Sequence, residues 1–420
     1  MTSPRIAVLG TLDTKLNEIR FVADEVRRFG GTPVVFNLGT EDVVDPVMSV
    51  SQADVRAAAG GAYSADKVGL MESAAEGAKR LLLDGIAAGD IDAALAVGGG
   101  QGSWMTSAAL RDLPVGFPRL LVSTAGRDVG QYTRFSDITS VFSITDVAGL
   151  NPLLTRVLST AAAGICGMAK SDAWRAPMPH GLTAMTVYGI TTAGARLVMS
   201  ELEDAGIDVV AFHSNGVGGP TMEAQIAAGT FAAVLDWSIT EVADDVVGGV
   251  CAVGPDRLTN AVKNGLPQVI VPGGVDVVNF GAPETLPAHL QGRPIHAHTP
   301  EATLLRTNAE ENVEIARLVA DRIRHSTAPI RVIVPLGGFS ALSTPDGTIP
   351  DPAADQAFFD ALTAALDDAP NVSVSSHPGA INSPEFAHHV AGEYLSLVRE
   401  HLSEPTLISA SADLHGKADQ

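Results

Sequence analysis

The chain has 420 residues, of which 46% are hydrophobic and 18% charged, so it holds enough apolar material for the cores of two globular domains. Forty-eight acidic against 27 basic residues give a formal charge of -21, which argues against a nucleic acid or an anionic membrane surface as partner. With two cysteines, a short interrupted apolar start and no apolar run of transmembrane length, the chain is expected to be a reduced cytoplasmic protein.

In the first part of the chain, apolar runs of strand length alternate with longer segments of helical period. This alternation is typical of a largely parallel α/β sheet. The predicted strands are residues 5–10, 33–37, 92–97 and 119–123. The predicted helices are residues 14–29, 64–88, 103–111 and 147–168.

Clustered prolines and a glycine at residues 174–181 interrupt the pattern and predict a linker. We therefore expect one lobe over residues 1–178, a second over 179–405 and a disordered or neighbour-wrapping tail over 406–420. The second lobe has predicted strands at residues 182–190, 207–213, 232–235, 267–271, 330–334 and 371–374. Its predicted helices are residues 193–205, 220–229, 256–264, 309–325, 352–367 and 384–401. The shared order of parts suggests a duplication, with an interlobe cleft between two α/β lobes.

A glycine-rich junction at residues 94–103 is the first candidate site, because a predicted strand runs there into a predicted helix. Glycine allows a sharp turn close to a ligand, and the amides at a helix start favour an anion such as phosphate. The candidate cofactor-binding residues are Gly98, Gly99, Gly100, Gly102 and Ser103, the last as a hydroxyl donor. The spacing matches neither common nucleotide motif, so a turn that only packs strand against helix remains the alternative.

The end of the first predicted strand supplies Gly10, Thr11, Asp13 and Lys15. Open α/β sheets bind ligands beyond the carboxyl ends of their strands. Lysine offers a charge for a phosphate, and Asp13 could hold a ribose hydroxyl or a metal such as Mg²⁺. An ordinary helix cap beside a solvated lysine is the competing interpretation.

A second junction of the same kind lies at residues 209–219. Here His213 precedes the possible cofactor-binding residues Asn215, Gly216, Gly218 and Gly219. Asp236 and Glu241 end the next predicted strand, so a catalytic group of His213, Asp236 and Glu241 is one hypothesis. A buried, hydrogen-bonded histidine with helix-capping acids is the other. No metal ligands can be assigned from the sequence.

Several segments resemble the family of the tomato mosaic virus resistance protein, an inhibitor of viral RNA replication. The similar segments are residues 8–15, 130–132, 137–138, 146–151, 212–223, 234–236, 240–241, 276–281, 303–307 and 310–312. The family often has Ser-Gly-His-Pro where this chain has residues 124–127 (Thr-Ala-Gly-Arg), so a role for that histidine is not transferred.

The resemblance implies two Rossmann-like subdomains, ATP binding in the amino-terminal lobe and a homodimer. Our leading hypothesis is a protein that binds ATP, or a similar phosphorylated small molecule, with Mg²⁺ offsetting the acidic surroundings. One rival is an enzyme that acts on a small sugar or acid in the interlobe cleft. Another is a regulatory protein that binds a nucleotide without turnover, so whether the chain is an enzyme is left open.

Overall fold

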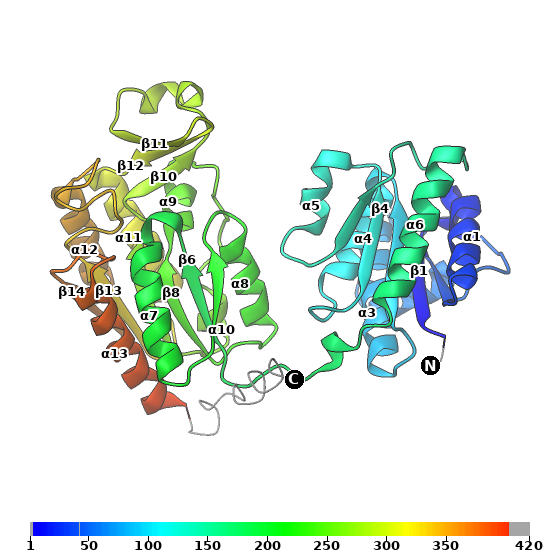
Figure 1. Ribbon diagram of the computed structural model, residues 1–420, viewed down its shortest axis with the longest axis horizontal. Coiled ribbons are helices and arrows are strands. Elements are labelled where there is room, and N and C mark those ends of the chain that lie inside the picture. The colour runs from blue at the N-terminus through cyan, green and yellow to red at the C-terminus, as the bar shows by residue number, and fades with distance from the viewer. Residues whose placement is uncertain (1–2, 42, 403–420) are drawn as a thin grey trace, which may run out of the picture. The chain divides into compact units, whose positions relative to one another are not determined.

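The computed structural model describes residues 3–41 and 43–402, so the expected tail at residues 406–420 lies outside the described part. The chain divides into two compact units, and the boundary in the sequence lies between Pro177 and Met178. We call them the N-terminal and C-terminal domains (Figure 1). Among the described residues, no helix is both long and apolar enough to cross a membrane.

The N-terminal domain contains a parallel five-stranded sheet in the order β2-β1-β3-β4-β5. Its strands are β1 (Arg5–Gly10), β2 (Thr32–Asn37), β3 (Ala93–Gly98), β4 (Arg119–Ser123) and β5 (Thr139–Phe142). Its α-helices are α1 (Leu12–Arg28), α2 (Gln52–Ala59), α3 (Lys67–Ala87), α4 (Gly100–Arg111), α5 (Gly130–Thr133) and α6 (Pro152–Met168).

Helices cover both faces of this sheet, as the continuous burial of β1 requires. Ile6 and Val8 belong to a core cluster with residues of α1 and α6. Ala7 and Leu9 belong to another cluster, with residues of α3 and α4. Side chains therefore alternate between two cores along one strand, which fixes its register and the position of its carboxyl end.

The C-terminal domain contains a parallel six-stranded sheet in the order β14-β13-β9-β8-β6-β7. Its strands are β6 (Thr183–Val187), β7 (Val209–His213), β8 (Ala233–Ser238), β9 (Gln268–Gly273), β13 (Ile330–Pro335) and β14 (Val372–His377). Its α-helices are α7 (Thr192–Asp204), α8 (Gly218–Ala227), α9 (Thr240–Val247), α10 (Asn260–Lys263), α11 (Ala309–Ile323), α12 (Pro352–Leu366) and α13 (Pro384–His401).

A small antiparallel sheet is inserted between β9 and β13 of this domain. It consists of β10 (Val277–Phe280), β11 (Ile295–Thr299) and β12 (Ala302–Arg306), in the order β10-β12-β11. Without this insertion, the strands of both domains follow one another in the same spatial order, 2-1-3-4-5, with a sixth strand added in the second. Both domains are thus doubly wound, Rossmann-like α/β units, as predicted.

The predicted strands of both series are present, but three local predictions are wrong. The helix expected at residues 147–168 begins only at Pro152, because the Asn151 side chain caps it by accepting from Leu153 N and Leu154 N. The helix expected at 256–264 is confined to Asn260–Lys263. The strand expected at 182–190 ends at Val187. The elements β5, α2, α5, α9 and the small sheet were not predicted. The strand β5, for instance, is mostly exposed and lacks an apolar pattern.

Candidate ligand-binding site

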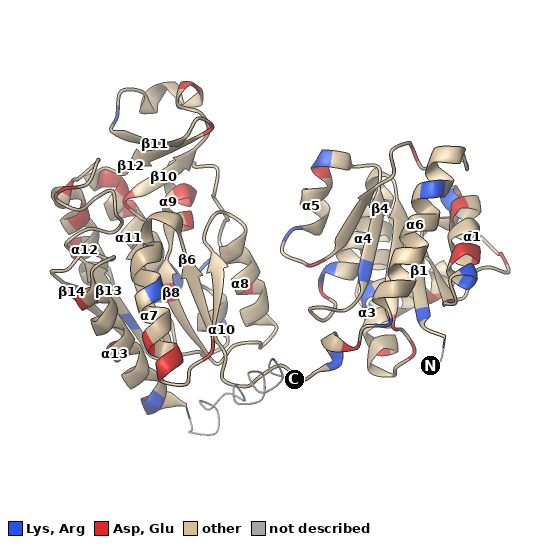
Figure 2. Cartoon of the chain, in the orientation of Figure 1, with Lys and Arg blue, Asp and Glu red and all other residues tan. Residues whose placement is uncertain are grey.

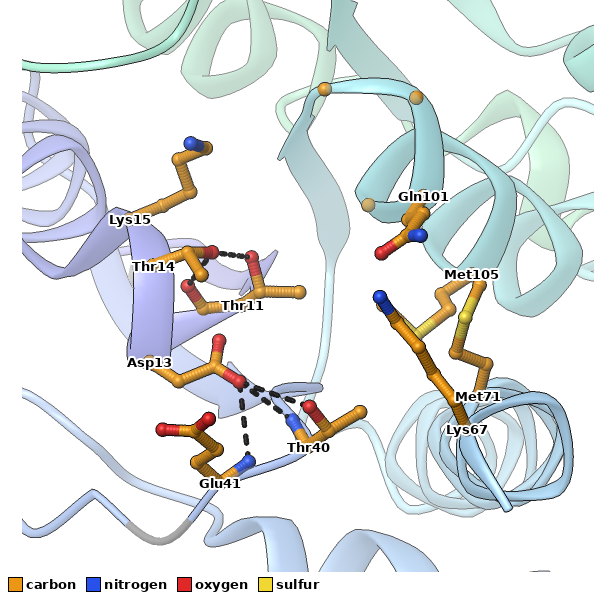
Figure 3. Close-up of a pocket in the computed structure, with 13 residues that line it drawn as sticks. Thr11, Asp13, Thr14, Lys15, Thr40, Glu41, Lys67, Met71, Gln101 and Met105 are labelled. Atoms are coloured by element: carbon orange, nitrogen blue, oxygen red, sulfur yellow. Dashed lines mark hydrogen bonds between the residues drawn. The ribbon is translucent and has the colours of Figure 1, made fainter.

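A cavity of about 470 Å³ lies at the carboxyl ends of β1, β2 and β3 in the N-terminal domain (Figure 3). β1 pairs with β2 on one side and with β3 on the other, so the connections leave the sheet in opposite directions at this point. Such a switch point is where doubly wound sheets bind ligands. The cavity is lined by Thr11, Asp13, Thr14, Lys15, Thr40, Glu41, Lys67, Met71, Gly99, Gly100, Gln101, Gly102 and Met105.

One wall of the cavity is the start of α1. The backbone leaves the helical region at Lys15 (φ −132°, ψ 27°), which separates the first turn from the rest of the helix. Asp13 Oδ2 accepts hydrogen bonds from the backbone N–H groups of Thr40 (2.8 Å) and Glu41 (3.2 Å). Asp13 Oδ1 is buried and has no hydrogen-bond partner among the described residues. One carboxylate oxygen thus holds the loop after β2, while the other is left for a further donor or a cation.

The glycine-rich junction forms the opposite wall. Gly99 is the N-cap residue of α4 and no side chain caps this helix, so the amides of its first turn lack an acceptor from a side chain. A Cβ atom at Gly100 or Gly102 would meet nothing within 4 Å. Exposed amides at a helix start, without a capping side chain, are suited to an anionic group.

Three residues predicted for this site do not line the cavity. A Cβ atom at Gly98 would lie 2.5 Å from Ser103 N, so this glycine lets β3 run closely into α4. Ser103 is buried, and its Oγ lies 2.7 Å from Ser123 Oγ and 3.2 Å from the carbonyl oxygen of Gly98, to which it donates. Gly10 is also buried, with Ile19 beside it. These three residues pack inside the junction and do not face the cavity.

The remaining lining residues were not identified from the sequence. Lys67 and Met71 come from the first turns of α3, and Met105 comes from α4. Thr40 and Glu41 follow β2. Only their positions in the sequence could have indicated these residues. Thr40 and Glu41 follow a strand beside β1, and Lys67 directly follows Asp66, whose side chain caps α3.

The cavity carries balanced charges, with Lys15 and Lys67 against Asp13 and Glu41. Neither lysine forms an ion pair with a residue that the structure describes, and the side chains of Lys15, Lys67 and Gln101 extend toward the open space (Figure 3). Elsewhere on α1, acidic and basic residues are interspersed (Figure 2). The two lysines therefore provide a local positive charge in a chain that is strongly acidic overall.

The second glycine-rich junction, between β7 and α8, is filled by a side chain of the protein itself. Glu241 Oε1 accepts hydrogen bonds from the backbone N–H groups of Gly216 (2.9 Å) and Gly219 (3.2 Å). A Cβ atom at Gly219 would lie 1.8 Å from Glu241 Oε2, so glycine is required for this approach. A Cβ atom at Gly218 would lie 2.0 Å from the carbonyl oxygen of His213. Two amides that could bind an external anion are thus bonded to an internal carboxylate.

Glu241 and Asp236 are joined by a residue that the sequence did not single out. Arg257 is fully buried and donates from Nε to Glu241 Oε2 (2.8 Å) and from both terminal nitrogens to Asp236. Burial alone would lower the pKa of Arg257, but these carboxylates and that of Glu223 raise it. In the sequence, Arg257 is one basic residue in a mainly polar segment, and nothing there distinguishes it from a surface arginine.

His213 is separate from this buried network. Its side chain is exposed, and its ring lies 6.2 Å from that of Tyr188 in a stacked arrangement. Within residues 3–41 and 43–402, no hydrogen bond joins the His213 ring to Asp236 or Glu241. The Asn215 side chain accepts locally from Val217 N (3.3 Å). The two acids thus belong to a buried network within the C-terminal domain, and the histidine lies at its surface.

Cysteine and metal chemistry have little support in the described part of the chain. Both cysteines are free, and burial raises the pKa of Cys166 and raises that of Cys251 to about 12, so both remain thiols near neutral pH. Among the described residues, no group of three or more His, Cys, Asp or Glu side chains is placed to hold a metal ion. A Mg²⁺ ion that shares its ligands with a phosphate would require only one or two carboxylates, which Asp13 and Glu41 could supply.

The sequence matches two models of one uncharacterised protein family, the N-terminal domain of UPF0261 over residues 4–173 and its C-terminal domain over residues 180–398. The chain belongs to the UPF0261 family. A UPF0261 protein of Clostridium tetani is 33% identical, with 94% of this chain and 99% of the relative covered. One from Mesorhizobium japonicum is 36% identical, with 94% and 99% covered.

A plant protein is also similar to this UPF0261 chain. The tomato (Solanum lycopersicum) protein named ToMV susceptible protein tm-1(GCR26) is 30% identical over 94% of this chain, which spans 56% of the tomato protein. Among solved structures, the glycosyltransferase SnogD from Streptomyces nogalater covers 94% of this chain and 99% of its own, at 11% identity and a TM-score of 0.19. The latter value is too low to relate the two folds.

Proposed function

We propose that the N-terminal domain binds a phosphorylated small molecule, with ATP as the first candidate, in the cavity between α1 and the β3–α4 junction. The observation that carries the proposal is the placement of Lys15, Lys67 and an uncapped helix start around one cavity at the switch point of the sheet. Lysine ammonium groups and oriented amides both favour phosphate oxygens. The resemblance to a family with an ATP-binding amino-terminal part supports the same ligand.

Two polar walls suggest how the ligand would be held. The amides after Gly99 would donate to phosphate oxygens from one side, and Lys15 would approach from the other. Asp13 Oδ1, buried without a partner, would accept a ligand hydroxyl or bind Mg²⁺ together with phosphate oxygens. Such a shared cation would offset the repulsion between the carboxylates of Asp13 and Glu41 and the phosphates.

An enzyme that uses His213, Asp236 and Glu241 has less support, since both carboxylates are bonded to Arg257. Binding without turnover and binding with hydrolysis are both compatible with the cavity. Measurement of phosphate release from ATP by the purified chain separates these two forms of the proposal. We expect a binding protein whose reaction, if any, takes place at the N-terminal cavity.

The test is calorimetric titration of the full chain with ATP, with and without Mg²⁺. We expect binding that weakens about tenfold in Lys15→Ala and further when Lys67→Ala is added, because each change removes a cation from the phosphate environment. Lys170→Ala is the matched control, since Lys170 is an exposed lysine of the same domain that does not line the cavity. The proposal is abandoned if neither ATP nor inorganic tripolyphosphate binds, or if the control weakens binding as much as Lys15→Ala.

A further inference from the structure

A second hollow, of about 430 Å³, adjoins the cavity just described. It is lined by Val68, Met71, Gly100, Gln101, Trp104 and Tyr132. Met71, Gly100 and Gln101 also line the first cavity, so the two spaces share a wall. The first cavity has four charged lining residues, whereas the second has none.

Apolar side chains in this hollow are unusually exposed. Trp104 has 37% and Val68 has 61% of its surface accessible to solvent. Among the described residues, neither the indole N–H of Trp104 nor the hydroxyl of Tyr132 has a hydrogen-bond partner. An accessible tryptophan beside a polar cavity is suited to stacking on a flat ring.

The division between the two spaces follows the helices. On α3, Lys67 lines the charged cavity and its neighbour Val68 lines the hollow. On α4, Gly100 and Gln101 line both, while Trp104, one turn later, lines only the hollow. A Cβ atom at Gly100 would meet nothing within 4 Å, so no side chain fills the space beside the shared wall.

We infer that the ligand has two parts, a phosphate-bearing group in the charged cavity and a planar aromatic ring in the hollow against Trp104 and Tyr132. This inference rests on the proposed function and narrows it to nucleotides, as opposed to phosphorylated sugars or small acids. A ligand without a ring would leave the apolar side chains of the hollow exposed to solvent. A nucleotide would cover Trp104 and Val68 and gain the free energy of that burial.

Recognition of the ring by stacking implies tolerance of the base. Gln101 is the one side-chain amide in the lining, and it can rotate to present either its donor or its acceptor. Every nucleobase has a flat face, so stacking on an aromatic side chain discriminates weakly among bases. We therefore expect adenine and guanine nucleotides to bind with affinities within about threefold of each other.

The experiment compares ATP, GTP and inorganic tripolyphosphate as ligands of the full chain by calorimetry. We expect both nucleotides to bind at least about tenfold more tightly than tripolyphosphate. In Trp104→Ala, ATP should bind about tenfold more weakly while tripolyphosphate binds as before. Trp104→Phe should retain most of the ATP affinity, because phenylalanine also stacks.

Tryptophan fluorescence gives a second readout that a purely structural role for Trp104 would not produce. The chain has three tryptophans, and Trp174 and Trp237 lie outside the hollow. ATP should quench the fluorescence of the unaltered chain and of Trp174→Phe, but not that of Trp104→Phe. Tripolyphosphate that binds as tightly as ATP, or a Trp104→Ala change that weakens both ligands equally, overturns the inference and leaves the proposed function standing. Strong preference for one base overturns the stacking account.

Discussion

The two glycine-rich junctions of this chain follow strands that flank the first strand of each sheet, but on opposite sides of it. In the N-terminal domain the strand is β3, which lies inside the sheet beside β1, and in the C-terminal domain it is the edge strand β7 beside β6. At the first, Gly100 and Gly102 border an open cavity. At the second, the amides of Gly216 and Gly219 bind the carboxylate of Glu241. The same sequence pattern therefore borders an open cavity in one domain, and in the other its amides are bonded to a side chain of the protein.

The difference arises from residues distant in the sequence. Arg257 holds Glu241 and Asp236 together in the buried network of the C-terminal domain. In the N-terminal domain, the cations near the junction are Lys15 and Lys67, and neither is paired with a described carboxylate. A glycine bend thus creates the capacity to bind an anion, and its surroundings decide whether a ligand or a side chain uses it.

The largest effect is expected from removing the internal anion. Glu241→Ala leaves the amides of Gly216 and Gly219 without an acceptor and removes one carboxylate from Arg257. We expect the free energy of unfolding to fall by about 3 to 5 kcal/mol in urea denaturation. Glu203→Ala, at an exposed glutamate of the same domain, is the control and should change it little. A loss of less than about 1 kcal/mol in Glu241→Ala would show that the buried network is not needed for stability.

Replacing a glycine by alanine should have different effects on stability at the two junctions. Gly219→Ala places a Cβ atom 1.8 Å from Glu241 Oε2 and 2.7 Å from Arg257 Nε, so the network must shift. We expect it to destabilise the chain by about 3 kcal/mol. Gly100→Ala meets nothing within 4 Å and should leave the urea midpoint nearly unchanged, while lowering ATP affinity by narrowing the cavity. Equal midpoints for the two variants would contradict the distinction between a filled and an open junction.

A smaller effect on the free energy of unfolding is expected from a change in pH, because the carboxyl group of Asp244 is buried near the filled junction. Burial raises the pKa of the Asp244 carboxyl from its ordinary value of about 3.8 to about 7. At a pH between the two pKa values, the Asp244 carboxyl is protonated in the folded chain and ionised in the unfolded chain. Its contribution to the free energy of unfolding is therefore complete at low pH and is lost as the pH rises through 7. We expect it to fall by about 2 kcal/mol between pH 5 and pH 7.

Urea denaturation at several pH values tests this expectation. Asp244→Asn should remove the contribution, so the difference in unfolding free energy between the unaltered chain and the variant should depend on pH in that range. Asp256→Asn, at an exposed carboxylate, should follow the unaltered chain at every pH. A pH-independent difference for Asp244→Asn would mean that Asp244 stays ionised in the folded protein.

The α/β class, most strands and helices of the two doubly wound sheets, and the junctions after β3 and β7 were predictable from the sequence, whereas β5, α2, α5 and α9 were not. The predictable features follow from local periodicity and glycine spacing, which act over a few residues. The sequence also indicated Thr11, Asp13, Lys15, Gly99, Gly100 and Gly102, because the carboxyl ends of neighbouring parallel strands meet at one edge of a sheet.

Which of the two junctions is open depends on contacts between elements that are distant in the sequence. Lys67 and Met71 reach the first cavity from a helix more than fifty residues after Lys15 in the sequence, and Arg257 enters the second network from a segment after α9. Ser103 shows the converse, because its position at a helix start suggested a ligand contact, whereas packing directs it toward Ser123. Periodicity reports which face of an element is apolar, but the partner of a polar side chain depends on how distant elements pack together.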